Sequence, residues 1–443
     1  MLVRAGSKVA VTSVAALAVA GLLGASAPAA RAATGPGRGS FYDYTGSMPL
    51  ARIAPGTVLK TRILSYHVAG IALPVQVVQL LYRSAGALGQ PSANVTSVLE
   101  PPVPLASPRA VSYQSFYDSL NPADEPSVQI AGDVTLGGLV TDAESVVIAP
   151  LLLQGYTVIV PDTEGQTADF SASPEYGINT LNSIRAATSS PLTGLGTSTP
   201  IGMFGYSGGA IATDWAAQLA PGYAPDVNRQ LVGAAEGGVL VDPAHNLTYV
   251  DGSQIWAGII PMAILGIARG FHVKITPYLS AYGQQLYGAL QKASIINVLG
   301  QYPGLTFAQL VKPQYANPAS IPVLVKVENE LNAGSRASPT IPMFIGQGAN
   351  GTDEGTPGNK PGIGPGDGVM IAGDVRTLAR HFCASGTAVD YTQYDALSHV
   401  TTFPVWAPAA LAWLGSRFAG GQAANDCAQI PPGNSLAPVK PAG

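Results

Sequence analysis

The pentapeptide Gly205-Tyr206-Ser207-Gly208-Gly209 holds the residue with the clearest chemical potential in this chain, a serine in a G-x-S-x-G pattern. Residues 200–204 before it have the apolar character of a buried strand, and apolar residues at helical spacing follow it. A serine at such a sharp turn exposes its hydroxyl above a helix N-terminus, whose dipole favours negative charge. The pattern predicts that Ser207 is a nucleophile and that the Gly208 N–H stabilises the resulting oxyanion.

A serine nucleophile needs a base, and His399 is the histidine best placed to supply it. When the nucleophile follows a strand in this way, the chain order is serine, acid, histidine. His399 lies in the loop 395–399, directly after a predicted strand at 389–394, where the base of such a site belongs. The other four histidines are disfavoured as the base by their positions in the chain. These are His67, His245, His272 and His381.

The acid that orients the base is expected in the loop after the predicted strand at 342–345. This loop is long and rich in Gly and Pro, and it holds Asp353, Glu354 and Asp367. Nearness to the strand favours Asp353, whereas the position just before a helical segment favours Asp367. The residue pattern alone leaves these two aspartates as alternatives.

Short apolar runs alternate with helical patterns along the chain, and these elements must position the reactive residues. Strands are expected at 156–160, 200–204, 231–235, 342–345 and 389–394. Continuous apolar runs are typical of parallel strands that are buried on both faces and connected by helices. We therefore predict an α/β-hydrolase fold with a mainly parallel sheet and a helical insertion.

The pattern changes between residues 237 and 338, which we interpret as a helical cap or lid inserted into one hydrolase core. The core is expected at 33–236 and 339–420, followed by a loop-like tail at 421–443. Residues 255–267 predict a pair of helices around Pro261 that is apolar nearly all round and therefore needs cover. Two interpretations explain this apolar surface. In the first it forms the interior of the cap, and in the second it forms an acyl-binding wall or an interfacial lid. The second interpretation predicts substrate contacts from these residues: Tyr206, Trp256, Ile260 and Met262.

The first 32 residues have the pattern of a secretory signal peptide, which predicts a secreted, extracellular protein. Arg4 and Lys8 precede an apolar core at 9–23, and Ala30-Arg31-Ala32 fits a cleavage site. This core is shorter than the roughly 18–20 residues that span a bilayer. No other segment predicts a membrane span.

Composition narrows the class of protein further. Of 443 residues, 47% are hydrophobic and only 11% charged, whereas disordered chains are rich in charge. The net charge is −4, and removal of the signal peptide with its three basic residues makes it −7. Because no basic excess is present to neutralise phosphates, no nucleic acid is expected as a partner. The low charge suits work at a lipid–water interface.

The chain contains two cysteines, Cys383 and Cys427. In an exported protein an even pair predicts one disulfide, here between a late helix and the C-terminal tail. No cluster of Cys and His has the spacing of a zinc site, so no metal is expected.

These motifs together resemble the secretory lipase family, the lipase A type of fungi and actinobacteria, over about residues 41–418. The elbow at Ser207 is one of the matching blocks. The others are Leu81-Tyr82-Arg83-Ser84 with Gly89-Gln90-Pro91, Ser112-Tyr113-Gln114, Tyr117-Asp118-Ser119, Pro161-Asp162-Thr163-Glu164-Gly165 and Arg185-Ala186-Ala187.

The resemblance assigns roles that the residue pattern leaves open. The family has a helix with a cysteine between the acid and the histidine, which favours Asp367 over Asp353, although an insertion at 351–366 lengthens the acid loop here. It also implies that Asp118 joins Gly208 in the oxyanion hole, which requires a protonated carboxyl. A cap with an acyl tunnel is implied as well.

The expected activity is ester hydrolysis through an acyl-enzyme on Ser207, with His399 as base, Asp367 as orienting acid and no cofactor. The resemblance favours a triacylglycerol or long-chain ester lipase. A carboxylesterase or acyltransferase for another exported ester is the alternative within enzymes. A non-catalytic secreted binding protein on a hydrolase scaffold is the alternative outside them.

Overall fold

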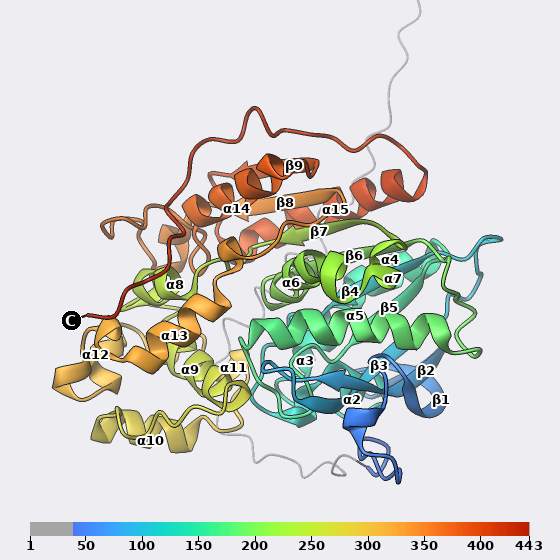
Figure 1. The fold of residues 1–443 in the computed structure, drawn as a ribbon, viewed down its shortest axis with the longest axis horizontal. Coiled ribbons are helices and arrows are strands. Elements are labelled where there is room, and N and C mark those ends of the chain that lie inside the picture. Colours follow the sequence, from blue (N-terminus) through green and yellow to red (C-terminus); the bar gives the residue numbers. More distant parts are fainter. Residues whose placement is uncertain (1–38, 443) are drawn as a thin grey trace, which may run out of the picture. The chain divides into compact units, whose positions relative to one another are not determined.

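A nine-stranded sheet organises residues 39–442, the part of the chain that the computed structural model describes (Figure 1). The predicted signal peptide lies outside the described residues. The strand order is β1-β2-β3-β5-β4-β6-β7-β8-β9. The strands are β1 Val58–Val68, β2 Ile71–Ala85, β3 Pro91–Leu99, β4 Ala110–Gln114, β5 Thr157–Pro161, β6 Ile201–Tyr206, β7 Leu231–Gly237, β8 Met343–Gly348 and β9 Val389–Tyr394.

The sheet has an antiparallel part and a parallel part. The pairs β1–β2, β2–β3 and β3–β5 are antiparallel, and every pair from β5 through β4 to β9 is parallel. The five predicted strands correspond to β5–β9, which confirms a mainly parallel α/β-hydrolase sheet. The first four strands were not predicted, because β1 and β2 mix polar with apolar residues and form a partly exposed hairpin.

Helices cover both faces of the sheet and bury alternate side chains of each strand. In β6, Ile201 and Met203 belong to one core cluster, while Phe204 and Tyr206 belong to another on the opposite face. The first face is covered by α5 Ser173–Ser189, α6 Gly208–Tyr223 and α14 Ala372–Ala384. The second is covered by α2 Pro126–Ile130, α4 Ser145–Leu153 and α15 His399–Phe418. Two short helices complete this core, α3 Leu139–Ala143 and α7 Pro225–Asn228.

Between β7 and β8 the chain forms the helical segment that we call the cap, residues 237–338, drawn in yellow-green to orange in Figure 1. The prediction of two apolar helices around Pro261 is wrong in the number of helices. Residues 259–270 form a single helix with Pro261 in its first turn, where the missing proline N–H is not needed. The cap helices are α8 Pro243–Val250, α9 Ile259–Gly270, α10 Ala281–Ala289, α11 Ile295–Val298, α12 Phe307–Leu310 and α13 Pro322–Leu331.

The C-terminal tail contains no helix or strand from Ala419 to Ala442, yet it is held firmly. The predicted disulfide between Cys383 and Cys427 is present and joins the tail to α14. Further along, the Asn329 side chain of α13 exchanges two hydrogen bonds with the backbone of Val439. The tail therefore links the core to the cap, as its dark red trace in Figure 1 shows. Among residues 39–442, no helix is long and apolar enough to cross a membrane.

Candidate active site

The turn between β6 and α6 carries Ser207 in a strained conformation, with φ 54° and ψ −122°. Two neighbouring glycines make the turn possible because other chain segments pass so close. A Cβ on Gly205 would lie 2.1 Å from the carbonyl oxygen of Gly209. A Cβ on Gly209 would lie 2.0 Å from the carbonyl oxygen of Gln114 on β4. The G-x-S-x-G pattern thus corresponds to a nucleophile elbow in three dimensions.

Ser207, His399 and Asp367 form one chain of hydrogen bonds. The Oγ of Ser207 is 2.8 Å from Nε2 of His399, and Nδ1 of His399 is 2.8 Å from Oδ2 of Asp367. The backbone N–H of His399 also donates to the Asp367 carbonyl at 2.7 Å, so both the ring and the backbone of His399 are held. This is the geometry in which an imidazole removes a proton from serine while a carboxylate orients it.

The structure places Asp367, and not Asp353, beside His399. Asp367 is fully buried, and its Oδ1 accepts hydrogen bonds from the backbone N–H groups of Val369 and Met370. Its Oδ2 accepts a third from the side chain of Gln347 at 2.9 Å. Asp353 is exposed and accepts a hydrogen bond from Asn350 instead. Gln347 is the penultimate residue of β8, just before the acid loop, and no motif in the sequence marks its role.

A second carboxylate, Glu354, lies close to His399. Its Oε2 accepts from Nε1 of Trp256 at 2.7 Å, and its Oε1 accepts from the backbone N–H of Val400 at 2.9 Å. The Trp256 ring meets the His399 ring edge-on, with ring centroids 5.2 Å apart. Glu354 therefore connects the cap to the segment that carries His399. The sequence shows Glu354 only as one more acid in a long loop.

Opposing effects act on the pKa of His399. Complete burial by itself lowers the pKa, but the carboxyl groups of Asp367, Glu354 and Asp118 outweigh burial and hold it above its usual range. The imidazolium that forms when Ser207 loses its proton is therefore favoured by its surroundings.

Asp118 lies in the loop after β4, in a left-handed conformation with φ 37°. Its carboxyl group is next to the elbow, because a Cβ on Gly208 would lie 1.8 Å from Oδ1 of Asp118. Burial raises the pKa of Asp118 to about 7, although the nearby His399 lowers it in part. Near neutral pH a substantial fraction of Asp118 is therefore a neutral acid, which is able to donate a hydrogen bond.

The loop around Asp118 is held from behind by a buried acid. Both carboxyl oxygens of Glu164 accept from the backbone N–H of Ser119, at 3.3 and 3.2 Å, and the hydroxyl of Tyr176 donates to one of them. Burial and the nearby Asp118 raise the pKa of Glu164 well above its usual value. The sequence could not assign this supporting role, since Glu164 lies 46 residues away from Asp118 in the chain.

An apolar cavity with an empty volume of about 880 Å³ opens onto Ser207, Asp118 and Gly208. Of the four expected substrate contacts, Trp256 and Ile260 line it, whereas Tyr206 and Met262 do not. The hydroxyl of Tyr206 donates to the carbonyl oxygen of His399 at 2.5 Å, so this side chain supports the histidine. Met262 faces the other side of α9 and is completely buried in the cap.

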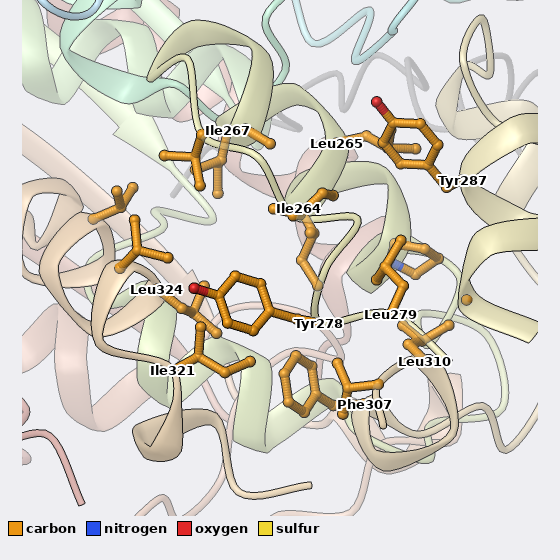
Figure 2. A pocket seen from close by; sticks show the side chains of 18 residues that line it. Ile264, Leu265, Ile267, Tyr278, Leu279, Tyr287, Phe307, Leu310, Ile321 and Leu324 are labelled. Atoms are coloured by element: carbon orange, nitrogen blue, oxygen red, sulfur yellow. The ribbon is translucent and has the colours of Figure 1, made fainter. Parts of the chain in front are cut away.

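A second apolar cavity of about 750 Å³ lies inside the cap (Figure 2). It is separated from the first by a wall of four aliphatic side chains that line both cavities. These are Ile264 and Ile267 of α9 with Leu324 and Val327 of α13. Figure 2 labels three of these four side chains, Ile264, Ile267 and Leu324, among those that line the second cavity. Within residues 39–442, no group of three or more His, Cys, Asp or Glu side chains is arranged to hold a metal ion.

Comparison with known proteins identifies the family of this chain. The profile of the family described as secretory lipase matches residues 129–426. The chain belongs to the secretory lipase family. The similarity extends over most of each chain. Lipase 4 of Candida albicans is 31% identical to this secretory lipase over 414 residues, which cover 90% of this chain and 84% of that protein. A probable inactive lipase of Mycobacterium tuberculosis is 31% identical over 372 residues, covering 83% and 79%.

Solved structures give the same result for this secretory lipase. Candida antarctica lipase A in its closed state has a TM-score of 0.75 and 25% identity, covering 88% of this chain and 89% of that one. An esterase from Xanthomonas oryzae, LipA, has a TM-score of 0.58 at 15% identity and supports the fold alone. Family membership makes the protein a hydrolase of the lipase and esterase kind, with esters as substrates.

Proposed function

We propose that this secretory lipase is a secreted serine hydrolase that cleaves lipid esters, triacylglycerols in particular, through Ser207, His399 and Asp367. The observation that carries the proposal is the unbroken hydrogen-bonded chain from Ser207 to Asp367 at the mouth of an apolar cavity. One relative is named a probable inactive lipase. Here all three side chains are present and in contact, which supports an active enzyme.

The reaction proceeds in two stages. His399 takes the proton of Ser207 as the serine oxygen attacks the ester carbonyl, and Asp367 stabilises the imidazolium. Collapse of the tetrahedral intermediate breaks the ester C–O bond, and His399 returns the proton to the departing alcohol. Water then attacks the acyl-enzyme with His399 again as base, which releases the fatty acid and restores Ser207. No cofactor takes part.

The oxyanion of each tetrahedral intermediate is stabilised by two groups in this proposal. The N–H of Gly208 points from the first residue of α6, where the helix dipole also favours negative charge. The protonated carboxyl of Asp118 donates the second hydrogen bond. The proximity of the Asp118 carboxyl to Gly208 and its raised pKa both support this role.

The proposed preference for esters with long acyl chains is supported by the apolar cavity at Ser207. Its lining is mostly aliphatic and aromatic, which suits the alkyl chain of a fatty acyl group. The low overall charge and the apolar cap suit access from a lipid–water interface.

Export of the protein is part of the same proposal. The family is secretory, and the Cys383–Cys427 disulfide belongs to an oxidising compartment. Sequencing the N-terminus of the protein recovered from the growth medium tests this. The expected first residue is Ala33, and recovery with residues 1–32 still attached would contradict cleavage.

The activity is tested with p-nitrophenyl esters from acetate to palmitate and with emulsified triolein. Ser207→Ala should lower kcat by about 10³-fold or more on every ester. Ser189→Ala, an exposed serine at the end of α5, serves as the matched control and should keep full activity. Hydrolysis of emulsified triolein separates a lipase from an esterase that is limited to short, soluble esters. Absence of activity on all these substrates would refute the enzyme proposal.

A further inference from the structure

Glu328 on α13 places a carboxyl group in the wall of the active-site cavity, among apolar neighbours. Asp118 and Glu328 are the two ionisable side chains that line this cavity. Asp118 lies beside the elbow, whereas Glu328 is carried by the cap, between Leu324 and Leu331 on the same helix. Only 5% of its surface is exposed. A carboxyl group in such an apolar place requires a reason, because burying it is costly.

The contacts of the neighbouring acid, Asp242, make the position of Glu328 unusual. Asp242 caps α8: its Oδ1 accepts from the backbone N–H groups of Ala244 and His245, and its Oδ2 accepts from Asn332. Asp242 therefore has a complete structural role. The Glu328 side chain, by contrast, makes no hydrogen bond or ion pair with any residue from 39 to 442. Its hydrogen-bonding capacity is left for a group inside the cavity.

Burial keeps the Glu328 carboxyl group neutral, and no cation among residues 39–442 compensates its charge closely enough to reverse this effect. Burial, with the Asp242 carboxyl as a smaller contribution, raises the pKa of Glu328 to about 8. The positive charge on its own helix, Lys326, is exposed and pairs with Glu330 at 3.7 Å. On α8, His245 has its Nδ1 within 3.1 Å of Asp374. At neutral pH Glu328 is thus mainly a carboxylic acid, which both donates and accepts a hydrogen bond.

We propose that Glu328 is a specificity site for acyl chains that carry a hydroxyl group, so that esters of hydroxy fatty acids are preferred substrates of this enzyme. The inference rests on the proposed ester hydrolysis at Ser207. The apolar lining takes the hydrocarbon, and the hydroxyl pairs with the Glu328 carboxyl group in the cap wall of the cavity. A hydroxyl fits this partner because it also donates and accepts. A plain alkyl chain leaves the Glu328 carboxyl without a partner, and that is costly to binding.

The kinetic test compares p-nitrophenyl stearate with p-nitrophenyl esters of octadecanoic acids hydroxylated at carbon 10, 12 or 18. The leaving group is constant, so only the acyl chain varies. The wild type should prefer at least one hydroxylated ester over the stearate by about 10-fold in kcat/KM. Glu328→Leu should abolish this preference and favour stearate, and Glu328→Gln should retain part of it. Glu330→Gln, on the exposed side of α13, is the matched control and should behave as wild type.

A binding measurement separates failure of this inference from failure of the proposed activity. Calorimetry with Ser207→Ala and the free acids, 12-hydroxystearic and stearic for example, needs no turnover. The hydroxy acid should bind about 10-fold tighter, and Glu328→Leu in the same background should remove the difference. The inference is overturned if the wild type shows the same kcat/KM for plain and hydroxylated esters, the Ser207→Ala variant binds both free acids equally well, and Glu328→Leu changes neither result. This conclusion holds even if the esterase activity is intact. Circular dichroism confirms that each variant is folded.

Discussion

Replacing Asp118 tests how this enzyme stabilises negative charge, because the proposed role requires the carboxyl to be protonated. Asparagine has nearly the same shape and keeps a donor at every pH, whereas alanine removes the group. With a pKa of about 7, Asp118 is about half protonated at pH 7, about one tenth at pH 8 and about one hundredth at pH 9. The kcat/KM of the wild type should therefore fall roughly tenfold per pH unit on the alkaline side.

Asp118→Asn should change both sides of the pH profile. The alkaline decline that belongs to Asp118 should disappear, because the amide does not titrate in this range. The acid side should move to lower pH, because the Asp118 carboxylate contributes to the raised pKa of His399. Since Asp118 and His399 affect each other, the measured values in the wild type belong to the pair. Asp118→Ala should lose about 10²-fold in kcat even at pH 6, where the wild-type carboxyl is protonated.

The assay measures kcat/KM for a soluble ester, p-nitrophenyl butyrate, from about pH 5 to about pH 9 at the isosbestic wavelength of nitrophenol. Asp353→Asn, which replaces an exposed aspartate of the acid loop, controls for general loss of charge. The reasoning is refuted if Asp118→Asn keeps the alkaline decline of the wild type, or if the Asn and Ala variants lose equal activity.

Two further predictions concern the carboxyl group of Glu354 and the disulfide of the C-terminal tail. Glu354→Gln should move the acid side of the pH profile to lower pH by roughly a few tenths of a unit, because Glu354 helps to raise the pKa of His399; an equal shift with Asp353→Asn would contradict it. Cys383→Ser with Cys427→Ser should lower the free energy of unfolding by about 3–4 kcal/mol in a denaturant titration, since the disulfide closes a loop across a separation of 44 residues. An unchanged denaturation midpoint would show that the tail contacts suffice without the disulfide.

Features that depend on neighbouring residues could be predicted from the sequence. The elbow at Ser207 is a local pattern of glycines between a strand and a helix, and the close approaches of Gly205 and Gly209 give its physical reason. The parallel strands β5–β9 follow from apolar runs of the right length. His399 could be selected because so few histidines were available and only one followed a late strand. The disulfide followed from an even pair of cysteines in a chain that begins with the pattern of a secretory signal peptide.

Features that depend on packing between distant segments needed the tertiary structure. Asp353 and Asp367 both lie in the acid loop, and only the folding of that loop brings Asp367 under His399 and leaves Asp353 in solvent. The same loop brings Glu354 to Trp256 of the cap, 98 residues away in the chain. Local periodicity contains no information on contacts between residues that are far apart in the sequence, because these contacts depend on how whole helices, strands and loops pack.

The contrast is sharpest for the carboxyl groups. The composition establishes a chain with little charge and an acidic balance, and the motif establishes where the nucleophile lies. Whether a given acid caps a helix, orients a histidine or faces a cavity depends on its burial and partners. Asp242 and Glu328 are both buried acids of the cap, yet only Asp242 has its oxygens occupied by the protein. That difference arises because α8 and α13 pack around an empty space, which the sequence of neither helix reveals.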